Sequence, residues 1–386
     1  MKDRVLITGG AGFIGSHLAA ELLQNGYRVR VLDLLTAQVH GTAAGWPDYL
    51  SRDTERVHAS VLDPAALCRA LRGCHAVIHL AAAVGVGQSM YEISHYAASN
   101  VQGTAELLQA ILALNRRPRP GGEHPEIERL LVASSMSLYG EGRYRCSACH
   151  QLCDTVRRDR AQLDAHRWDP LCPTCGARLD PQPTPESKPV ALHSFYALTK
   201  QVQEAMALLF GRTYRLPTLA LRLFNVYGPH QALSNPYTGA VAIFAARLRA
   251  GLPPLLFEDG EQQRDFVHVN DVAHAFRLAL DRPEVSDTAL NIASGVPLRL
   301  NQLASALANA MGSTQTPRRS GRYRWGDIRH CIADISAARS HLGYQPQMTL
   351  QAGLAQLAGW LQPMPRVPRH RLQRATAELA TFGLTG

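Results

Sequence analysis

Short apolar runs alternate with amphipathic segments along the first third of the chain. Strand-like runs such as RVLIT, YRVRVLD and HAVIHLAA (residues 4–8, 27–33 and 75–82) are followed by helix-like segments such as FIGSHLAAELLQNG and NVQGTAELLQAILALN (13–26 and 100–115). Apolar strands separated by amphipathic helices indicate βαβ units, whose parallel strands are buried on both faces. The pattern therefore predicts an α/β fold with a doubly wound parallel sheet.

The size and polarity of the chain fit a globular enzyme. With 386 residues, of which 46% are hydrophobic and 18% charged, it can bury a large core and a satellite lobe. No run of about 18 apolar residues occurs, so we expect no membrane span. The strand-like run 4–8 leaves no room for the apolar core of a signal peptide. We therefore expect a cytoplasmic protein.

The net charge of +9 suits an anionic partner, either nucleic acid or the diphosphate of a nucleotide sugar. The lysines and arginines are scattered, however, and much of the excess lies in loop or tail segments such as NRRPRPGGEHPE and RVPRHRLQR. A solvated surface explains most of this charge. We expect no nucleic-acid partner.

A glycine-rich turn, TGGAGFIGSH, joins the first strand to the first helix. Gly9, Gly12 and Gly15 fall where a tight turn, a close approach to a pyrophosphate and close helix packing each exclude a Cβ. Asp33 ends the second strand about 20 residues later, where a carboxylate holds ribose hydroxyls and repels a 2′-phosphate. The arrangement predicts NAD as cofactor rather than NADP.

A tyrosine and a lysine, Tyr196 and Lys200, lie four residues apart in SFYALTKQVQE and so on one face of a helix. A phenol titrates near pKa ~10, but an adjacent ammonium favours the phenolate. In LLVASSMSLYG, Ser134 and Ser135 end a strand at the sheet edge where ligands bind. Tyr196, Lys200 and Ser135 are therefore the predicted catalytic residues.

In this order, these motifs resemble the extended short-chain dehydrogenases/reductases of the nucleotide-sugar epimerase and dehydratase branch. The resemblance runs from Lys2 to about Gln362, apart from a cysteine-rich segment and the tail. It implies a Rossmann-type NAD-binding domain and a smaller C-terminal lobe that binds a nucleotide-diphosphate sugar. We also expect a homodimer.

The resemblance also implies site residues beyond the motifs. Further NAD contacts, besides Tyr196 and Lys200, are expected from Phe13, Ile14, Ala81, Ala82 and Asn100. Substrate contacts are expected from Ser137, Asn225, Phe257, Arg264, Arg324 and Asp327, with the arginines on the diphosphate and Phe257 against the base. One position departs from the family: Ser60 stands where an Asp often meets the adenine, and Asp63 is expected to cap the next helix.

The two residues directly after Ser135 narrow the choice among the reactions of this branch. The dehydratases that the chain resembles place an Asp and a Glu there as acid and base, and the decarboxylases place a Glu at the second position. This chain has Met136 and Ser137. Epimerisation at C4 requires only Tyr196, Lys200, Ser135, a retained cofactor and a roomy pocket. The sequence therefore favours a nucleotide-sugar 4-epimerase.

Two C-x-x-C pairs, Cys146/Cys149 and Cys172/Cys175, interrupt this region. Their spacing fits a zinc ribbon in which four thiolates close a tetrahedron, so the predicted zinc is structural. Cys153 is a spare thiol, and His150 and His166 are weaker ligand candidates. Because the segment leaves after the serine strand and returns before the Tyr196 helix, we expect it at the mouth of the sugar pocket.

The expected domains are built from these assignments. The NAD-binding domain comprises 1–143 and 184–223, with a return around 264–290; the zinc ribbon comprises 144–183; the substrate lobe comprises 224–263 and 291–361; and 362–386 is a tail.

Three alternatives stay open. The substrate could belong to the UDP-glucose or UDP-glucuronate type. The enzyme could be a reductase of 4-keto sugars that consumes NADH. A zinc-ribbon nucleic-acid-binding protein is a third interpretation, which the complete Ser, Tyr and Lys set disfavours.

Overall fold

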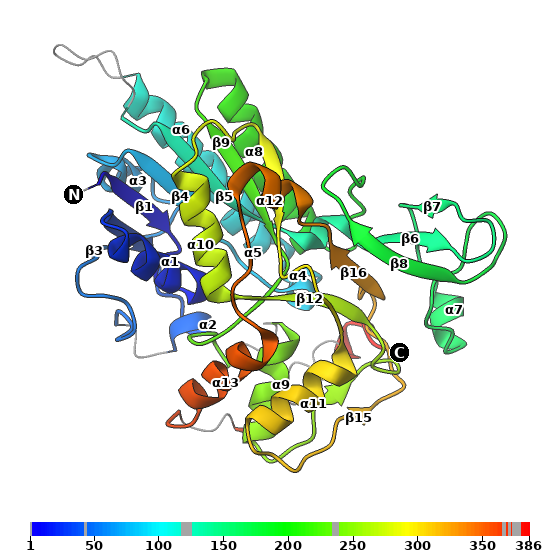
Figure 1. The fold of residues 1–386 in the computed structure, drawn as a ribbon. Coiled ribbons are helices and arrows are strands. Elements are labelled where there is room, and N and C mark those ends of the chain that lie inside the picture. The colour runs from blue at the N-terminus through cyan, green and yellow to red at the C-terminus, as the bar shows by residue number, and fades with distance from the viewer. Residues whose placement is uncertain are drawn as a thin grey trace.

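The computed structural model describes residues 2–41, 45–116, 126–233, 239–364, 368–369, 372 and 380–386. Over these residues, seven parallel strands form the main sheet (Figure 1). Their spatial order is β3 (Glu55–His58), β2 (Arg28–Asp33), β1 (Arg4–Thr8), β4 (Ala76–His79), β5 (Arg129–Ser135), β9 (Thr218–Leu223) and β13 (Thr288–Ile292). The order reverses direction at β1, which is the arrangement of a Rossmann-type doubly wound sheet. The predicted α/β fold is confirmed.

Helices cover both faces of this sheet, because alternate residues of each buried strand point to opposite sides. Val5 and Ile7 of β1 belong to one apolar core, and Leu6 between them belongs to another. The first core is closed by α1 (Phe13–Gln24), α10 (Val269–Leu280) and α12 (Ser336–Leu342), and the second by α3 (Pro64–Leu71), α6 (Gly103–Asn115) and α8 (Phe195–Tyr214). Two-sided burial explains why the central strands β1, β4, β5 and β9 are mostly apolar.

A second sheet runs through the C-terminal lobe into the cysteine segment. Its order is β10 (Asn225–Tyr227), β12 (Gln263–His268), β16 (His330–Ala333), β8 (Leu179–Thr184), β6 (Arg143–Cys146) and β7 (Leu152–Cys153), with β14 (Pro297–Arg299) also paired to β12. A small core beneath it comes from α9 (Ala240–Arg249), α11 (Leu300–Ala310) and α13 (Leu350–Leu361). Strands β11 (Leu255–Leu256) and β15 (Arg318–Arg319) form a separate pair. The cysteine segment is thus continuous with the sheet of the lobe.

Short helices complete the described chain: α2 (Ala37–His40), α4 (Val86–Ser89), α5 (Ile93–Tyr96), the π-helix η1 (Ala97–Gln102), the 3₁₀ helix η2 (Met136–Tyr139) and α7 (Arg160–Asp164). No helix within the described ranges is long and apolar enough to span a bilayer. Of the predicted tail, only 362–364, 368–369, 372 and 380–386 are described, and the rest lies outside these residues.

Two local expectations from the sequence differ from the structure in their bounds. A further strand-like run of the sequence, RVHASVLD (residues 56–63), ends as a strand at His58; Asp63 accepts hydrogen bonds from Ala65 N and Ala66 N (2.9 and 3.0 Å) and begins α3. This confirms Asp63 as a helix cap. The segment 100–115 starts inside a π-helix and becomes an α-helix only at Gly103.

Candidate active site and cysteine cluster

The glycine turn between β1 and α1 has the geometry that a bound pyrophosphate requires. Gly9 has a φ of +70°, and a Cβ there would lie 2.8 Å from Ala81 N. A Cβ on Gly15 would lie 2.5 Å from the Gly10 Cα, so the helix could not pack against the turn. A Cβ on Gly12, by contrast, would meet only the Gly9 carbonyl, at 3.3 Å, among the described atoms. Gly12 therefore leaves room for a ligand at the N-terminus of α1, which begins with Phe13 and Ile14.

The carboxylate of Asp33 is fixed beside this turn at the end of β2. Its two oxygens accept hydrogen bonds from Ala11 N (3.0 Å) and Leu35 N (2.9 Å). His40 Nε2 lies 3.7 Å from the carboxylate. Asp33 thus supports the turn. Its place at the end of β2 is also the one expected for a carboxylate that binds the ribose of NAD. The cradle at Gly12 and this carboxylate together fit NAD.

The three predicted catalytic residues converge at the end of β5. The Ser135 hydroxyl accepts hydrogen bonds from Ser137 N (3.1 Å) and Ser137 Oγ (2.9 Å), and it lies close enough to Tyr196 to affect the pKa of that phenol. Lys200 Nζ donates to the carbonyl of Ala133, two residues earlier on β5, at 2.5 Å. Tyr196 is held at the start of α8, whose cap is Ser194. A strand end and a helix start therefore bring the set together.

The expected effect of Lys200 on Tyr196 is not seen in this arrangement. Burial raises the pKa of Tyr196, and the nearby Ser135 hydroxyl opposes this rise only in part. Burial also lowers the pKa of Lys200 to about 7, against an opposing effect of Glu204. Burial thus sets the direction of both pKa shifts in the protein without cofactor, and the expected stabilisation of the phenolate beside bound NAD stays a prediction. A positively charged nicotinamide ring would favour the phenolate.

Sequence reasoning missed a buried polar chain that supports Lys200. Lys200 Nζ donates to the side chain of Gln203, whose Nε2 lies 2.9 Å from His79 Nε2. His79 Nδ1 lies 2.7 Å from Thr8 Oγ1 on β1, and burial lowers the His79 pKa to about 3, so the ring is neutral. The spacing of Gln203, three residues after Lys200, was the available signal. This series of hydrogen bonds ties Lys200 to β1, the strand that leads into the glycine turn.

A second missed network lies behind the serine strand. Glu204 accepts from Ser134 Oγ (2.5 Å) and forms a bidentate ion pair with Arg222 on β9 (2.6 and 3.0 Å). Arg222 Nη1 also donates to Tyr139 OH at 2.9 Å. Ser134 therefore has a structural partner, which leaves Ser135 as the serine that faces Tyr196.

The predicted cofactor wall is held by Asn100. Its side chain accepts from Ala83 N (2.7 Å) and donates to Ala83 O (3.1 Å) and Thr199 Oγ1 (2.9 Å). It thereby links the segment of Ala81 and Ala82 to the catalytic helix. The expected contacts of these three residues with NAD stay predictions.

Four of the predicted substrate residues gather around segment 324–329. The Arg324 guanidinium lies 4.6 Å from the centre of the Phe257 ring and 2.7 Å from Asp327 Oδ2. Arg264 donates to the backbone carbonyls of Ile328 (2.5 Å) and Arg329 (2.9 Å). The guanidiniums of Arg264 and Arg324 and the ring of Phe257 thus lie in the same region of the lobe.

The other two predicted substrate residues lie nearer the catalytic serine. Asn225 comes after β9 and donates to Asp265 O at 2.9 Å and to the sulfur of Met136 at 3.4 Å. Ser137 donates to Ser135. The substrate roles of all six residues stay predictions.

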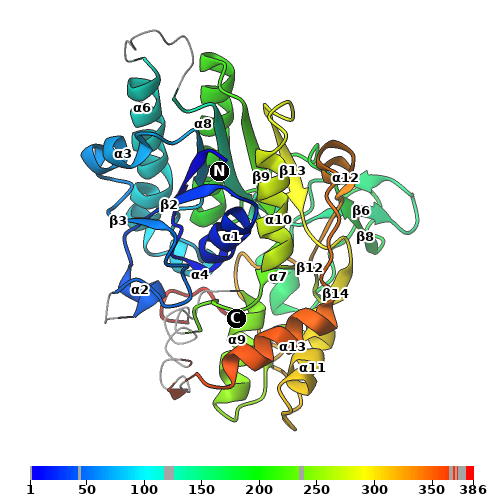
Figure 2. The same ribbon diagram turned by 60° about the vertical axis from the view of Figure 1, so that its left-hand side comes forward.

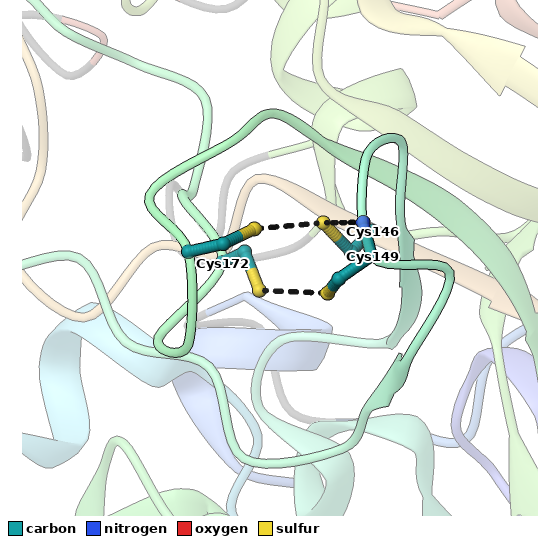
Figure 3. Close-up of side chains that lie close together, drawn as sticks. Cys146, Cys149 and Cys172 are labelled. Carbon is teal, nitrogen blue, oxygen red and sulfur yellow. Dashed lines mark hydrogen bonds between the residues drawn. The ribbon is translucent and has the colours of Figure 1, made fainter.

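The four cysteines of the C-x-x-C pairs converge on one point (Figure 3). Their sulfurs lie within 4.8 Å of one another, with 3.4 Å between Cys146 and Cys175 and 3.8 Å between Cys149 and Cys172. Tetrahedral zinc with Zn–S bonds of about 2.3 Å requires sulfurs about 3.8 Å apart. The donor set and its spacing therefore fit zinc, with no position left for a substrate.

Backbone donors favour the thiolate at Cys146 and Cys172, whereas neighbouring cysteine side chains raise the pKa values of Cys149 and Cys175. Cys146 Sγ accepts from Cys149 N and Ala148 N, both at 3.4 Å, and these hydrogen bonds lower the pKa of Cys146. Corresponding donors lower the pKa of Cys172 to about 6. Among the described residues, Cys153, His150 and His166 are not part of the group.

The cysteine end of the segment projects from the main sheet (Figure 1), and the expected position of the segment at the mouth of the sugar pocket stays a prediction. Both views show β6, β7 and β8 projecting away from the main sheet (Figures 1 and 2). Strands β6 and β8 pair with each other and form the stem of the cysteine segment. Strand β8 also pairs with β16 of the lobe, and this pairing directs the cysteine end outward. The stretch between the two cysteine pairs also contacts the lobe, where Tyr323 OH donates to Asp164 at 2.6 Å.

Comparison with known proteins agrees with this architecture. The model of the NAD dependent epimerase/dehydratase family matches residues 5–153 and 174–293. The chain belongs to this family. Residues 154–173, which comprise most of the stretch between the cysteine pairs and also Cys172, lie outside the match.

Curated and solved relatives span the whole chain. A dTDP-L-rhamnose 4-epimerase of Burkholderia thailandensis is 36% identical over 93% of this chain and 94% of its own. The UDP-glucose 4-epimerase of Thermotoga maritima, solved with UDP-glucose, is 29% identical with a TM-score of 0.73, covering 93% and 98% of the two chains. That of Thermus thermophilus, solved with NAD, is 27% identical with a TM-score of 0.71, covering 94% and 100%.

Replacement of one cysteine tests the metal site. The purified protein should contain one zinc per chain, and Cys172→Ser should lose it because three thiolates no longer close the tetrahedron. Hydrogen exchange should then increase over residues 144–180, while NAD stays bound at the separately packed main sheet. Sugar affinity and turnover should fall together. Zinc-free native protein, or normal kinetics in the variant, would contradict this prediction.

Replacement of Asp33 tests the choice of cofactor. Asp33→Ala should weaken NAD and relax the preference against NADP, since the carboxylate binds the 2′-hydroxyl and repels a phosphate. Asp33→Asn is the matched control, because an amide oxygen still accepts from Ala11 N or Leu35 N without the charge. Titration with both cofactors should show better NADP binding in each variant. Unchanged NAD affinity in Asp33→Ala would mean that this carboxylate does not meet the ribose.

Proposed function

We propose that this protein is an NAD-dependent 4-epimerase of nucleotide-diphosphate sugars, of the type that interconverts dTDP-L-rhamnose and dTDP-6-deoxy-L-talose. The observation that carries the reaction type is the convergence of Ser135, Tyr196 and Lys200 beside the glycine turn, with Met136 and Ser137 directly after the serine. Neither Met136 nor Ser137 can serve as the acid and base of a dehydratase. The choice of sugar is supported by the relative of Burkholderia thailandensis, which matches nearly end to end.

In the proposed reaction, the Tyr196 oxygen takes the proton of the sugar C4 hydroxyl and returns it after the sugar has turned. Ser135, close to Tyr196, can orient the same substrate oxygen. Bound NAD supplies a reversible hydride acceptor for C4, which allows hydride to return to the opposite face of a 4-keto sugar. Lys200, anchored on Ala133 O, and the positive ring of bound NAD would together favour the phenolate of Tyr196.

The lobe residues bind the part of the substrate that does not react. Arg264 and Arg324 present guanidiniums suited to a diphosphate, Asp327 can accept from the nucleotide ribose, and Phe257 presents a ring to the base. Gly9, Gly12 and Gly15 with Asp33 hold NAD. Binding energy from these remote groups keeps the nucleotide fixed while the sugar ring turns.

The four cysteines hold zinc as a structural ion. A core of only six buried side chains, Tyr144, Cys146, Cys153, Val156, Cys172 and Leu179, surrounds the cluster. So small a core requires the metal for its folding energy. We further propose a homodimer and the division into an NAD-binding domain, a zinc ribbon, a substrate lobe and a tail at the boundaries expected from the sequence.

A substrate panel tests the proposed function. Protein purified without added cofactor should carry NAD and should epimerise one sugar among dTDP-, UDP- and GDP-linked substrates, followed by NMR of the C4 proton. Activity on a dTDP-6-deoxy sugar supports the specific proposal. Activity only on UDP-glucose or UDP-glucuronate would overturn the sugar and keep the reaction. Net consumption of NADH with a 4-keto sugar would identify a reductase instead.

Removal of the phenol tests the mechanism. Tyr196→Phe should lower turnover about 10²- to 10⁴-fold, because only the proton acceptor is lost. NAD content and the thermal unfolding midpoint should stay close to those of the native protein. Near-native epimerisation by this variant would contradict the assigned role.

A further inference from the structure

The stretch between the two cysteine pairs makes a set of buried contacts that the proposed reaction does not use. Arg158 lies in this stretch, within the residues that the family model does not match. Its side chain is 3% exposed, and so is that of Glu141, while that of Glu258 is 1% exposed. An arginine buried this deeply must have its donors satisfied, and its partners identify what it holds.

Arg158 joins three parts of the chain at one guanidinium. Its Nε donates to Glu141 (3.1 Å) at the base of the stem, and its Nη1 donates to Glu258 (2.7 Å). Its Nη2 donates to the backbone carbonyl of Asp327 at 2.9 Å. Glu258 comes directly after Phe257, so Arg158 links both segments that carry the expected nucleotide contacts.

The conformation of Glu258 shows that this link shapes the backbone. Glu258 has a φ of +55°, a left-handed conformation that costs energy in a residue with a Cβ. Its carboxylate is shared between Arg158 Nη1 and Arg329 Nη1 (2.7 and 3.0 Å). Arg329 in turn binds Asp169 of the cysteine segment at 2.8 Å. Two guanidiniums therefore hold the turn that presents Phe257.

Weaker contacts reach the same segment. The Arg160 guanidinium lies 5.2 Å from the centre of the Trp325 ring, and Asp164 accepts from Tyr323 OH. The cysteine segment thus contacts segment 323–329 at Tyr323, Trp325, Asp327 and Arg329. Buried ion pairs contribute little net stability but are costly to break, so they fix geometry more than they add free energy of folding.

We infer that the stretch between the cysteine pairs positions the nucleotide-binding residues, and that Arg158 is the positioning residue that couples Phe257 to Asp327. The inference rests on the proposed function, because it takes these two residues as nucleotide contacts. Arg158 itself touches neither sugar nor cofactor in this assignment. It acts on affinity for the nucleoside diphosphate, and the chemical step at Tyr196 does not depend on it.

The test is Arg158→Gln in zinc-containing, NAD-loaded protein, with calorimetric titration of whichever of dTDP, UDP and GDP the native protein binds most tightly. The Kd and the KM should each rise about 10-fold or more, with kcat within about threefold, as expected when coupling to a binding site is lost. Arg158→Lys should leave the Kd and the KM nearly as high as Arg158→Gln does, because an ammonium cannot span acceptors in three directions. Zinc and NAD content should stay native.

The matched control is Arg178→Gln. Arg178 lies on the same segment, but its side chain is 70% exposed and its ion pair with Asp180 measures 3.6 Å. This control variant should bind the nucleoside diphosphate as the native protein does. If Arg158→Gln does not fold, Tyr323→Phe, which removes only the hydrogen bond to Asp164, should raise the Kd in the same direction by a smaller factor.

The outcomes separate the two proposals. Failure of the native protein to bind any of the three nucleoside diphosphates would overturn the proposed function and this inference with it. Native binding with an unchanged Kd in the folded Arg158 variant, or in Tyr323→Phe where that variant is used, would overturn the inference alone. A lower unfolding midpoint with unchanged KM would show that Arg158 only stabilises the fold.

Discussion

The parallel pairing of β1 with β2, β4 and, through β4, β5 is the constraint on which the site depends. Parallel strands end at the same edge, so the glycine turn, Asp33 and Ser135 meet there although Ser135 lies more than 100 positions after the other two. Helix α8 then needs only to pack on β5 to bring Tyr196 to Ser135. Every proposed role in the chemistry depends on that shared edge.

Much of this edge could be predicted because its signals are local. Gly9, Gly12 and Gly15 are glycines for reasons of backbone geometry, Asp33 and Ser135 end apolar runs, and the Tyr196 and Lys200 pair has helical spacing. The cysteine pairs are equally local, since the two ligands of each pair lie within a few residues of each other. Such features can be recognised without knowing which segments meet.

The sequence could not supply the features that depend on long-range packing. The partners Glu141, Arg158, Glu258 and Arg329 are spread over nearly 190 positions and look like ordinary surface charges until the lobe is assembled. The direction of the cysteine end depends on long-range packing as well, because it is set by the pairing of β8 with β16. The pKa of Tyr196 depends on burial, which helical spacing does not reveal.

The two ends of the cysteine segment meet at its base, where Arg143 N donates to Thr184 Oγ1 at 3.1 Å and β6 pairs with β8. A module whose ends are adjacent can be gained or lost during evolution by a single insertion or deletion, without altering the register of any strand in the main sheet. Its contacts with the lobe could then have been acquired later, one charged residue at a time. The ancestry of the cofactor-binding half and that of this module need not coincide.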